Sequence, residues 1–164
     1  MRRLLLLAIL ALATALAVPT VALAADPVQR PFAGRCETAP IIGPSPTPGA
    51  LFRVTFVGSC RLTHLGRTSQ VAVEDVFAGP GGLTLAGTST YTAADGDSFT
   101  TTFAGPVQQT GPTTVSFEGT EIVVGGTGRF VGATGATRFA GSAVTAPPGQ
   151  PGAGWFTIEG TISY

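Results

Sequence analysis

The sequence of 164 residues predicts an export signal followed by one all-β domain, a single eight-stranded antiparallel barrel. Three observations support this prediction. An apolar N-terminal run precedes a small-x-small site, eight alternating segments are separated by Gly, Pro and Asp, and a glycine follows two positions after a large apolar residue in each segment. A two-sheet sandwich is the alternative that the same pattern allows.

Residues 1–24 have the three parts of a secretory signal peptide. Arg2 and Arg3 supply positive charge, an apolar run extends from Leu4 to Val18, and cleavage after Ala24 would leave residues 25–164 as the barrel domain. The run is shorter than the about 20 apolar residues that a membrane-spanning helix needs. We therefore expect a mature protein that is secreted or periplasmic and not embedded in a membrane.

The composition of the chain limits the classes of partner, metal and cofactor that we expect it to bind. After cleavage, seven arginines would face nine acidic residues, which gives no basic surface for nucleic acid. Lysine and asparagine are absent, as is typical of a GC-rich bacterial genome. His64 is the only histidine and there are two cysteines, too few ligands for a zinc site. We expect no metal and no cofactor; the oligomeric state stays open.

Eight strands are expected in order along the mature chain. Their ranges are 32–42, 51–62, 67–77, 82–92, 97–104, 113–124, 137–145 and 154–164. The segments 43–49 and 147–152 between them are rich in proline, which lacks the N–H that a β-ladder needs, so both are expected to be loops. Ala94-Asp95-Gly96-Asp97 is the clearest hairpin turn.

The recurring triplet of a large apolar residue, any residue and glycine favours closure of the sheet. A spacing of two puts the apolar side chain and the glycine on one face of a strand, where the glycine allows the strand to bend sharply. Closure also removes the unpaired edges of a sheet that has few charges to protect them. The eight triplets begin at Phe32, Phe56, Phe77, Leu85, Phe103, Phe117, Phe139 and Ile158.

The same alternation assigns residues to the inner and outer faces. The expected core contains Phe32, Val54, Phe56, Val71, Val73, Leu83, Leu85, Phe99, Phe103, Val115, Phe117, Val123, Phe139, Phe156, Ile158 and Ile162. Five polar residues share this face: Arg67, Asp75, Tyr91, Asp97 and Glu121. Trp155 and the arginines Arg35, Arg53 and Arg61 are expected on the outer wall.

Cys36 and Cys60 are predicted to form a disulfide, because a lone pair of cysteines in an exported protein is most simply paired. Each follows a Phe-x-Gly-x-Cys segment, so both thiols share the apolar face. If the first two strands form an antiparallel hairpin in which the cysteines face each other, the turn is centred on Pro48, inside the proline-rich loop.

Two motifs carry a family resemblance. The segment Val123–Gly135, with its Gly-Gly-Thr-Gly-Arg-Phe core, resembles a segment of dirigent proteins and allene oxide cyclases. Thr63-His64-Leu65-Gly66-Arg67 is similar to a motif of bacterial exported proteins of that superfamily, which largely have no assigned activity. The resemblance implies an eight-stranded antiparallel barrel. The glycines suit a tight connection across a barrel end, and no Gly-Lys-Ser/Thr follows to make a phosphate loop.

Three functions remain open for such a barrel, and whether the protein is an enzyme is undecided. The first is an exported barrel of unassigned activity that binds a small apolar ligand or acts as an interaction module. The second is an isomerase or cyclase of the allene oxide cyclase type. The third is a dirigent-like protein that orients reactive intermediates. The candidate catalytic residues are Glu121, Arg67, Tyr91 and Asp75. The candidate cavity residues are Phe56, Phe99, Phe103, Phe117, Phe139 and Ile158.

Overall fold

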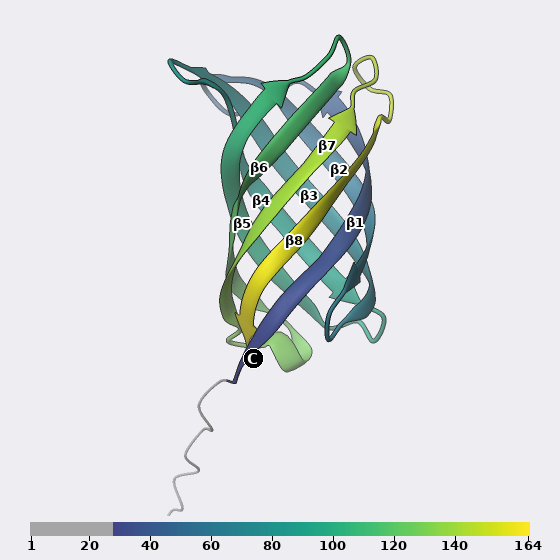
Figure 1. Ribbon diagram of the computed structural model, residues 1–164, viewed down its shortest axis with the longest axis vertical. Coiled ribbons are helices and arrows are strands. Elements are labelled where there is room, and N and C mark those ends of the chain that lie inside the picture. The colour runs from purple at the N-terminus through teal and green to yellow at the C-terminus, as the bar shows by residue number, and fades with distance from the viewer. Residues whose placement is uncertain (1–27) are drawn as a thin grey trace, which may run out of the picture.

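A computed structural model describes residues 28–164, so the proposed signal peptide at 1–24 lies outside the described residues. Eight strands form a closed antiparallel barrel in which each strand pairs with the next and the last pairs with the first (Figure 1). A 3-10 turn, η1 (Gly128–Phe130), follows the sixth strand. The strands are β1 (Gln29–Gly43), β2 (Ala50–Leu62), β3 (Gly66–Gly79), β4 (Gly82–Ala93), β5 (Ser98–Gln109), β6 (Thr114–Gly126), β7 (Thr134–Val144) and β8 (Ala153–Ser163).

The barrel prediction is confirmed, and most strand boundaries agree with the expected ranges within three residues. The largest difference is β5, which was expected to end at 104 and continues to Gln109. Both proline-rich segments are connections, and Ala94-Asp95-Gly96-Asp97 joins β4 to β5. Residues 28–164 contain no helix that is long and apolar enough to cross a membrane.

The predicted disulfide is present and defines the β1–β2 register. Cys36 is the pairing partner of Cys60, their Cα atoms are 4.0 Å apart, and both side chains are buried. The connection between β1 and β2 is therefore centred where the sequence placed it, in the proline-rich loop.

The expected inner face of β3 is wrong. Val71 is 57% exposed and Val73 shares its outward face, whereas the alternate residues of the strand point inward. The turn at 63–65 is so short that Leu62 pairs with Gly66 and Cys60 pairs with Thr68. Directly paired residues of an antiparallel sheet share a face, so the buried Cys60 places the even-numbered residues of β3 inside. The inward set is Thr68, Gln70, Ala72, Glu74 and Val76.

Arg67 and Asp75 were expected inside and lie outside for the same reason. Arg67 is exposed. Asp75 forms an ion pair with Arg53 on the outer wall at 2.8 Å. Ser45 and Thr47 of the proline-rich loop also donate hydrogen bonds to the Asp75 carboxylate, which explains why this outward residue is nevertheless 9% exposed.

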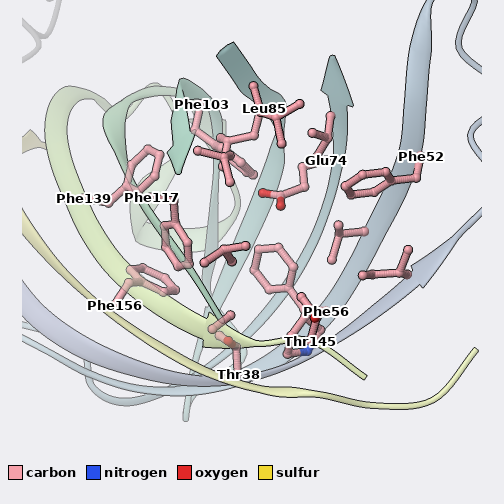
Figure 2. Close-up of a pocket in the computed structure, with 18 of the residues that line it drawn as sticks. Thr38, Phe52, Phe56, Glu74, Leu85, Phe103, Phe117, Phe139, Thr145 and Phe156 are labelled. Carbon is pink, nitrogen blue, oxygen red and sulfur yellow. The ribbon is translucent and has the colours of Figure 1, made fainter. Parts of the chain in front are cut away.

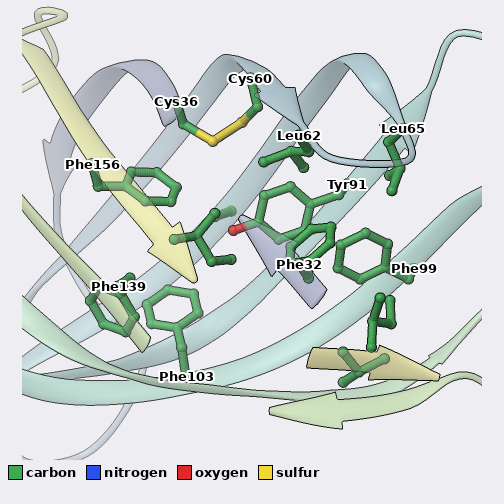
Figure 3. Close-up of a cluster of buried hydrophobic side chains, with 14 of the residues drawn as sticks. Phe32, Cys36, Cys60, Leu62, Leu65, Tyr91, Phe99, Phe103, Phe139 and Phe156 are labelled. Atoms are coloured by element: carbon green, nitrogen blue, oxygen red, sulfur yellow. A yellow bond between two sulfur atoms is a disulfide. The ribbon is translucent and has the colours of Figure 1, made fainter. Parts of the chain in front are cut away.

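One end of the barrel, which carries both ends of the described chain, is filled by aromatic side chains (Figure 3). The Phe99 ring stacks on Tyr91 with 4.9 Å between centroids and meets Phe32 and Phe130 edge-on. η1 brings Phe130 into this cluster, where it is fully buried. This end of the barrel is packed.

The glycine-rich motif builds the closure of that packed end. Gly128 has φ +56°, and a Cβ there would overlap the Asp97 carboxylate. That carboxylate accepts a hydrogen bond from the backbone N–H of Arg129. Glycine at position 128 adopts this left-handed backbone without strain and leaves space for the Asp97 carboxylate at the start of η1.

Candidate ligand-binding cavity

The other end of the barrel is hollow. Its cavity lies among the end of β1, the start of β2 and the corresponding ends of the remaining strands (Figure 2). This is the end of the barrel opposite the one that carries both ends of the described chain. The cavity volume is about 120 Å³, far more than the ~10–15 Å³ that holds one water. Six aromatic residues line it: Phe52, Phe56, Phe103, Phe117, Phe139 and Phe156.

The difference between the two ends follows from the side chains that each strand supplies. At the packed end, the three strands β1, β4 and β5 and the η1 turn contribute aromatic rings that contact one another. At the hollow end, several inward positions hold smaller residues, among them Val54, Val76, Val107, Val115 and Ala143. An eight-stranded barrel is just wide enough to be filled by side chains or to hold one small ligand, so these smaller residues leave space.

A hydrogen-bonded cluster forms the polar part of the cavity floor. The Tyr91 hydroxyl donates to Glu121 Oε1 at 2.9 Å, and the Thr137 hydroxyl donates to Glu121 Oε2 at 3.1 Å. Gln70 Nε2 donates to the Tyr91 oxygen at 3.2 Å and to Ser89 Oγ at 2.9 Å. The five side chains come from β3, β4, β6 and β7, so only the closed barrel assembles them.

Burial makes Glu121 an unusual carboxyl group. It is 3% exposed, and burial raises its pKa to about 7, although the hydrogen bonds from Tyr91 and Thr137 act in the opposite direction. Burial and the charge of Glu121 together raise the pKa of the Tyr91 hydroxyl, which therefore stays protonated and acts as a donor. A carboxyl that titrates near neutrality in an apolar site can act as acid or base.

Glu74 is a second carboxyl in the same cavity. Figure 2 shows its side chain beside Phe52 and Leu85, with the carboxylate directed toward the space between the lining residues. Within residues 28–164 no side chain or backbone group donates a hydrogen bond to it, and burial raises its pKa to about 7. The apolar pattern of β3 predicts Glu74 on the outer wall, so the sequence pattern did not point to it as a site residue. The short turn at 63–65 is the signal that could have placed it inside.

The structure brings together some of the predicted site residues and separates others. Glu121 and Tyr91 are in contact, whereas Arg67 and Asp75 lie on the outer wall. Of the predicted cavity residues, Phe56, Phe103, Phe117 and Phe139 line the cavity. Phe99 and Ile158 belong instead to the buried core. Three further polar residues point inward that were not among the predicted site residues: Gln70, Glu74 and Thr137.

A comparison with solved structures supports the fold. The structure of the pterocarpan synthase dirigent protein is similar, with a TM-score of 0.57 and 13% sequence identity over 90% of this chain and 95% of that chain. The chain therefore has a dirigent-like barrel fold. No protein-family profile and no curated protein matches the chain.

Proposed function

We propose that this protein is an exported barrel that binds one small, largely apolar molecule in the cavity of its hollow end. The observation that carries this proposal is an aromatic-lined cavity of about 120 Å³ with few polar groups. Apolar cavities of about 150 Å³ take molecules of the size of benzene. A concave, mostly apolar site with a few convergent polar groups is the usual form of a ligand pocket.

Export is part of the proposal. The signal-like segment at 1–24 supports it, and so does the Cys36–Cys60 disulfide, because such bonds persist in the periplasm and outside cells. The lysine-free composition supports a bacterial source. Edman sequencing of the protein recovered after expression in a bacterial host should begin at Ala25; retention of the N-terminal segment would contradict this part.

Ligand binding is tested with toluene as a neutral probe of the cavity. We expect toluene to raise the Tm of the exported protein and to shift the methyl resonances of Val76 and Val115 in NMR spectra, because both residues line the cavity. Ala143→Phe should abolish these effects by filling the cavity. The control is Ala140→Phe on the same strand, whose side chain is exposed on the outer wall. Equal binding by the two variants, or none by the parent protein, would contradict the proposal.

A second candidate function is an isomerase or cyclase reaction of the allene oxide cyclase type. The observation that favours it is Glu121, a buried carboxyl with a pKa of about 7 that Tyr91 and Thr137 hold in one orientation. In such a reaction the cavity would fold the substrate and the carboxyl would move one proton. A dirigent-like orientation of intermediates formed elsewhere is supported only by the similarity of the fold.

A model proton abstraction tests this second candidate. The base-promoted ring opening of 5-nitrobenzisoxazole reports on a carboxylate in an apolar site. We expect the protein to accelerate it above the rate in buffer, with a pH profile that rises through about pH 7. Glu121→Gln should remove the acceleration while toluene binding persists. Acceleration that survives this substitution would exclude Glu121 as the base.

A further inference from the structure

The charges around the cavity are of one sign. Glu74 and Glu121 both line it, and among residues 28–164 no arginine or histidine does so. Arg53 lies on the wall near the same end of the barrel, but its side chain is outside, paired with Asp75. A carboxylate of Glu74 therefore has no cationic partner from the described part of the chain.

Two lining groups also receive no hydrogen bond from any group of residues 28–164. One is the Glu74 carboxylate. The other is Gln70 Oε1, which is buried and accepts no hydrogen bond in the described chain. The orientation of this amide follows from its neighbours: Tyr91 donates its hydroxyl hydrogen to Glu121, so the Tyr91 oxygen is free to accept from Gln70 Nε2. Both unmatched groups are acceptors, and a complementary ligand therefore brings donors.

We propose that the occupant of the cavity is a small organic amine, whose ammonium group pairs with the Glu74 carboxylate while its apolar part lies against the phenylalanines. This inference rests on the proposed binding function and names the chemical class of its ligand. An ammonium group carries three donors and a positive charge, and charge-assisted hydrogen bonds to carboxylates are the strong ones. The faces of the lining phenylalanine rings also attract a cation.

Charge distinguishes an amine from other ligands of the same shape. A carboxylate ligand would meet two acidic side chains and no basic side chain from the described part of the chain, so it does not fit the site. An alcohol can donate one hydrogen bond to Glu74 but leaves its charge uncompensated in an apolar site, which is costly. An amine supplies both the donor and the opposite charge.

Four probes of nearly equal size separate these possibilities: toluene, benzyl alcohol, benzylamine and benzoate. Their affinities are measured by calorimetry on the exported protein at pH 7.5 and low ionic strength. We expect benzylamine to bind at least tenfold more tightly than toluene and benzyl alcohol, and benzoate not to bind. Raising the salt concentration should weaken benzylamine binding only slightly, because a buried pair is screened little.

Substitution of Glu74 tests the partner of the amine. Glu74→Gln should lower the affinity for benzylamine at least tenfold more than it changes the affinity for toluene. The matched control is Glu118→Gln, which neutralises an exposed glutamate and should change neither affinity. A thermal melt of each variant verifies that the barrel is folded.

The outcomes keep this inference separate from the proposed function. If none of the four probes binds, the binding function itself fails. If toluene binds but benzylamine binds no more tightly, or if benzyl alcohol matches benzylamine, the cavity is a ligand site and the amine inference is overturned. An amine preference that survives Glu74→Gln would likewise overturn the assignment of Glu74.

Discussion

Glu121 and Glu74 line the same cavity but differ in the hydrogen bonds that their carboxyl groups accept. Glu121 accepts hydrogen bonds from Tyr91 and Thr137, so two donors stabilise its charge. Glu74 has no such donor in the described chain, and burial alone raises its pKa. A buried polar group without partners lowers stability, and such groups are retained at sites that use them. The Glu74 carboxylate should therefore lower the stability of the folded barrel, and the amine ligand proposed above would offset this cost.

The pH dependence of stability should reveal this cost. Burial raises the pKa of Glu74 from 4.5 to about 7, so between these values the folded protein binds more protons than the unfolded chain. The free energy of unfolding therefore falls as pH rises from about 5 to 8. Glu74→Gln should be more stable than the parent protein by about 1–3 kcal/mol at pH 8 and nearly equal to it at pH 5. Urea unfolding at the two pH values measures this; a parent protein that gains stability with rising pH would contradict it.

The Tyr91 hydroxyl is the central member of the floor cluster. Tyr91→Phe would leave Glu121 with one donor and remove one of the two acceptors of Gln70 Nε2. We expect a loss of about 1–3 kcal/mol in the free energy of unfolding, because buried polar groups would be left unmatched. Tyr164→Phe is the control, since the hydroxyl of Tyr164 makes no hydrogen bond within residues 28–164. Equal effects of the two substitutions in urea unfolding would show that the cluster contributes nothing to stability.

At the scale of the element, β3 shows a conflict between pattern and register. Its valines at 71 and 73 outnumber the apolar residues of the opposite face at the middle of the strand, yet they lie outside. The short turn at 63–65 sets the β2–β3 register, and a register shift of one residue would move every side chain of β3 to the other face. Because paired residues share a face, the residues of β3 that pair with the buried face of β2 must also point into the barrel.

Substitution of adjacent residues tests this face assignment. Ala72 is buried and Val71 is exposed. Ala72→Phe should destabilise the barrel by about 1–3 kcal/mol or more, because it overpacks the interior. Val71→Phe should change stability by less than ~0.5 kcal/mol, as is usual on a surface. Denaturant unfolding of both variants provides the comparison, and the reverse order of effects would restore the face that the sequence pattern predicted.

For the whole molecule, closure divides the interior into a packed end and a hollow end. The aromatic cluster around Phe99 and the η1 turn stabilise the packed end, and the hollow end contains the cavity. The disulfide joins β1 to β2 between neighbouring inward positions and lies in the buried core. This arrangement leaves a cavity lined by Glu74 and Glu121 beside a packed core.

Removal of the disulfide should weaken the entire barrel. Cys36 and Cys60 are 24 residues apart, and opening a loop of this size lowers stability by about 3 kcal/mol, mainly by freeing the unfolded chain. The double variant Cys36→Ala, Cys60→Ala should show this loss in urea unfolding. The control is the parent protein unfolded in the presence of a reductant. Reduction breaks the disulfide but keeps both cysteine side chains, so it separates the effect of the bond from the effect of lost packing. A change below ~1 kcal/mol in the double variant would contradict the prediction.

The sequence by itself determined the local and pairwise features of this protein. Strand positions follow from alternation and from turn residues, and the disulfide follows from two cysteines in equivalent Phe-x-Gly-x-Cys segments. The inward position of Glu121 follows from its spacing to Phe117 and Val123 on the same strand. Each of these properties depends on residues within one strand or one hairpin, where a period of two is sufficient to assign a face.

The tertiary structure alone decided the inner face of β3, the contact of Glu121 with Tyr91 and the presence of a cavity at one end. The first depends on a register that competes with the apolar pattern of the strand itself. The second joins residues that lie 30 positions apart on non-adjacent strands. The third depends on the summed volume of inward side chains from all eight strands, which no single segment encodes. The position of Glu74 in the cavity could not be predicted, because it depends on both the β3 register and the volumes of the surrounding side chains.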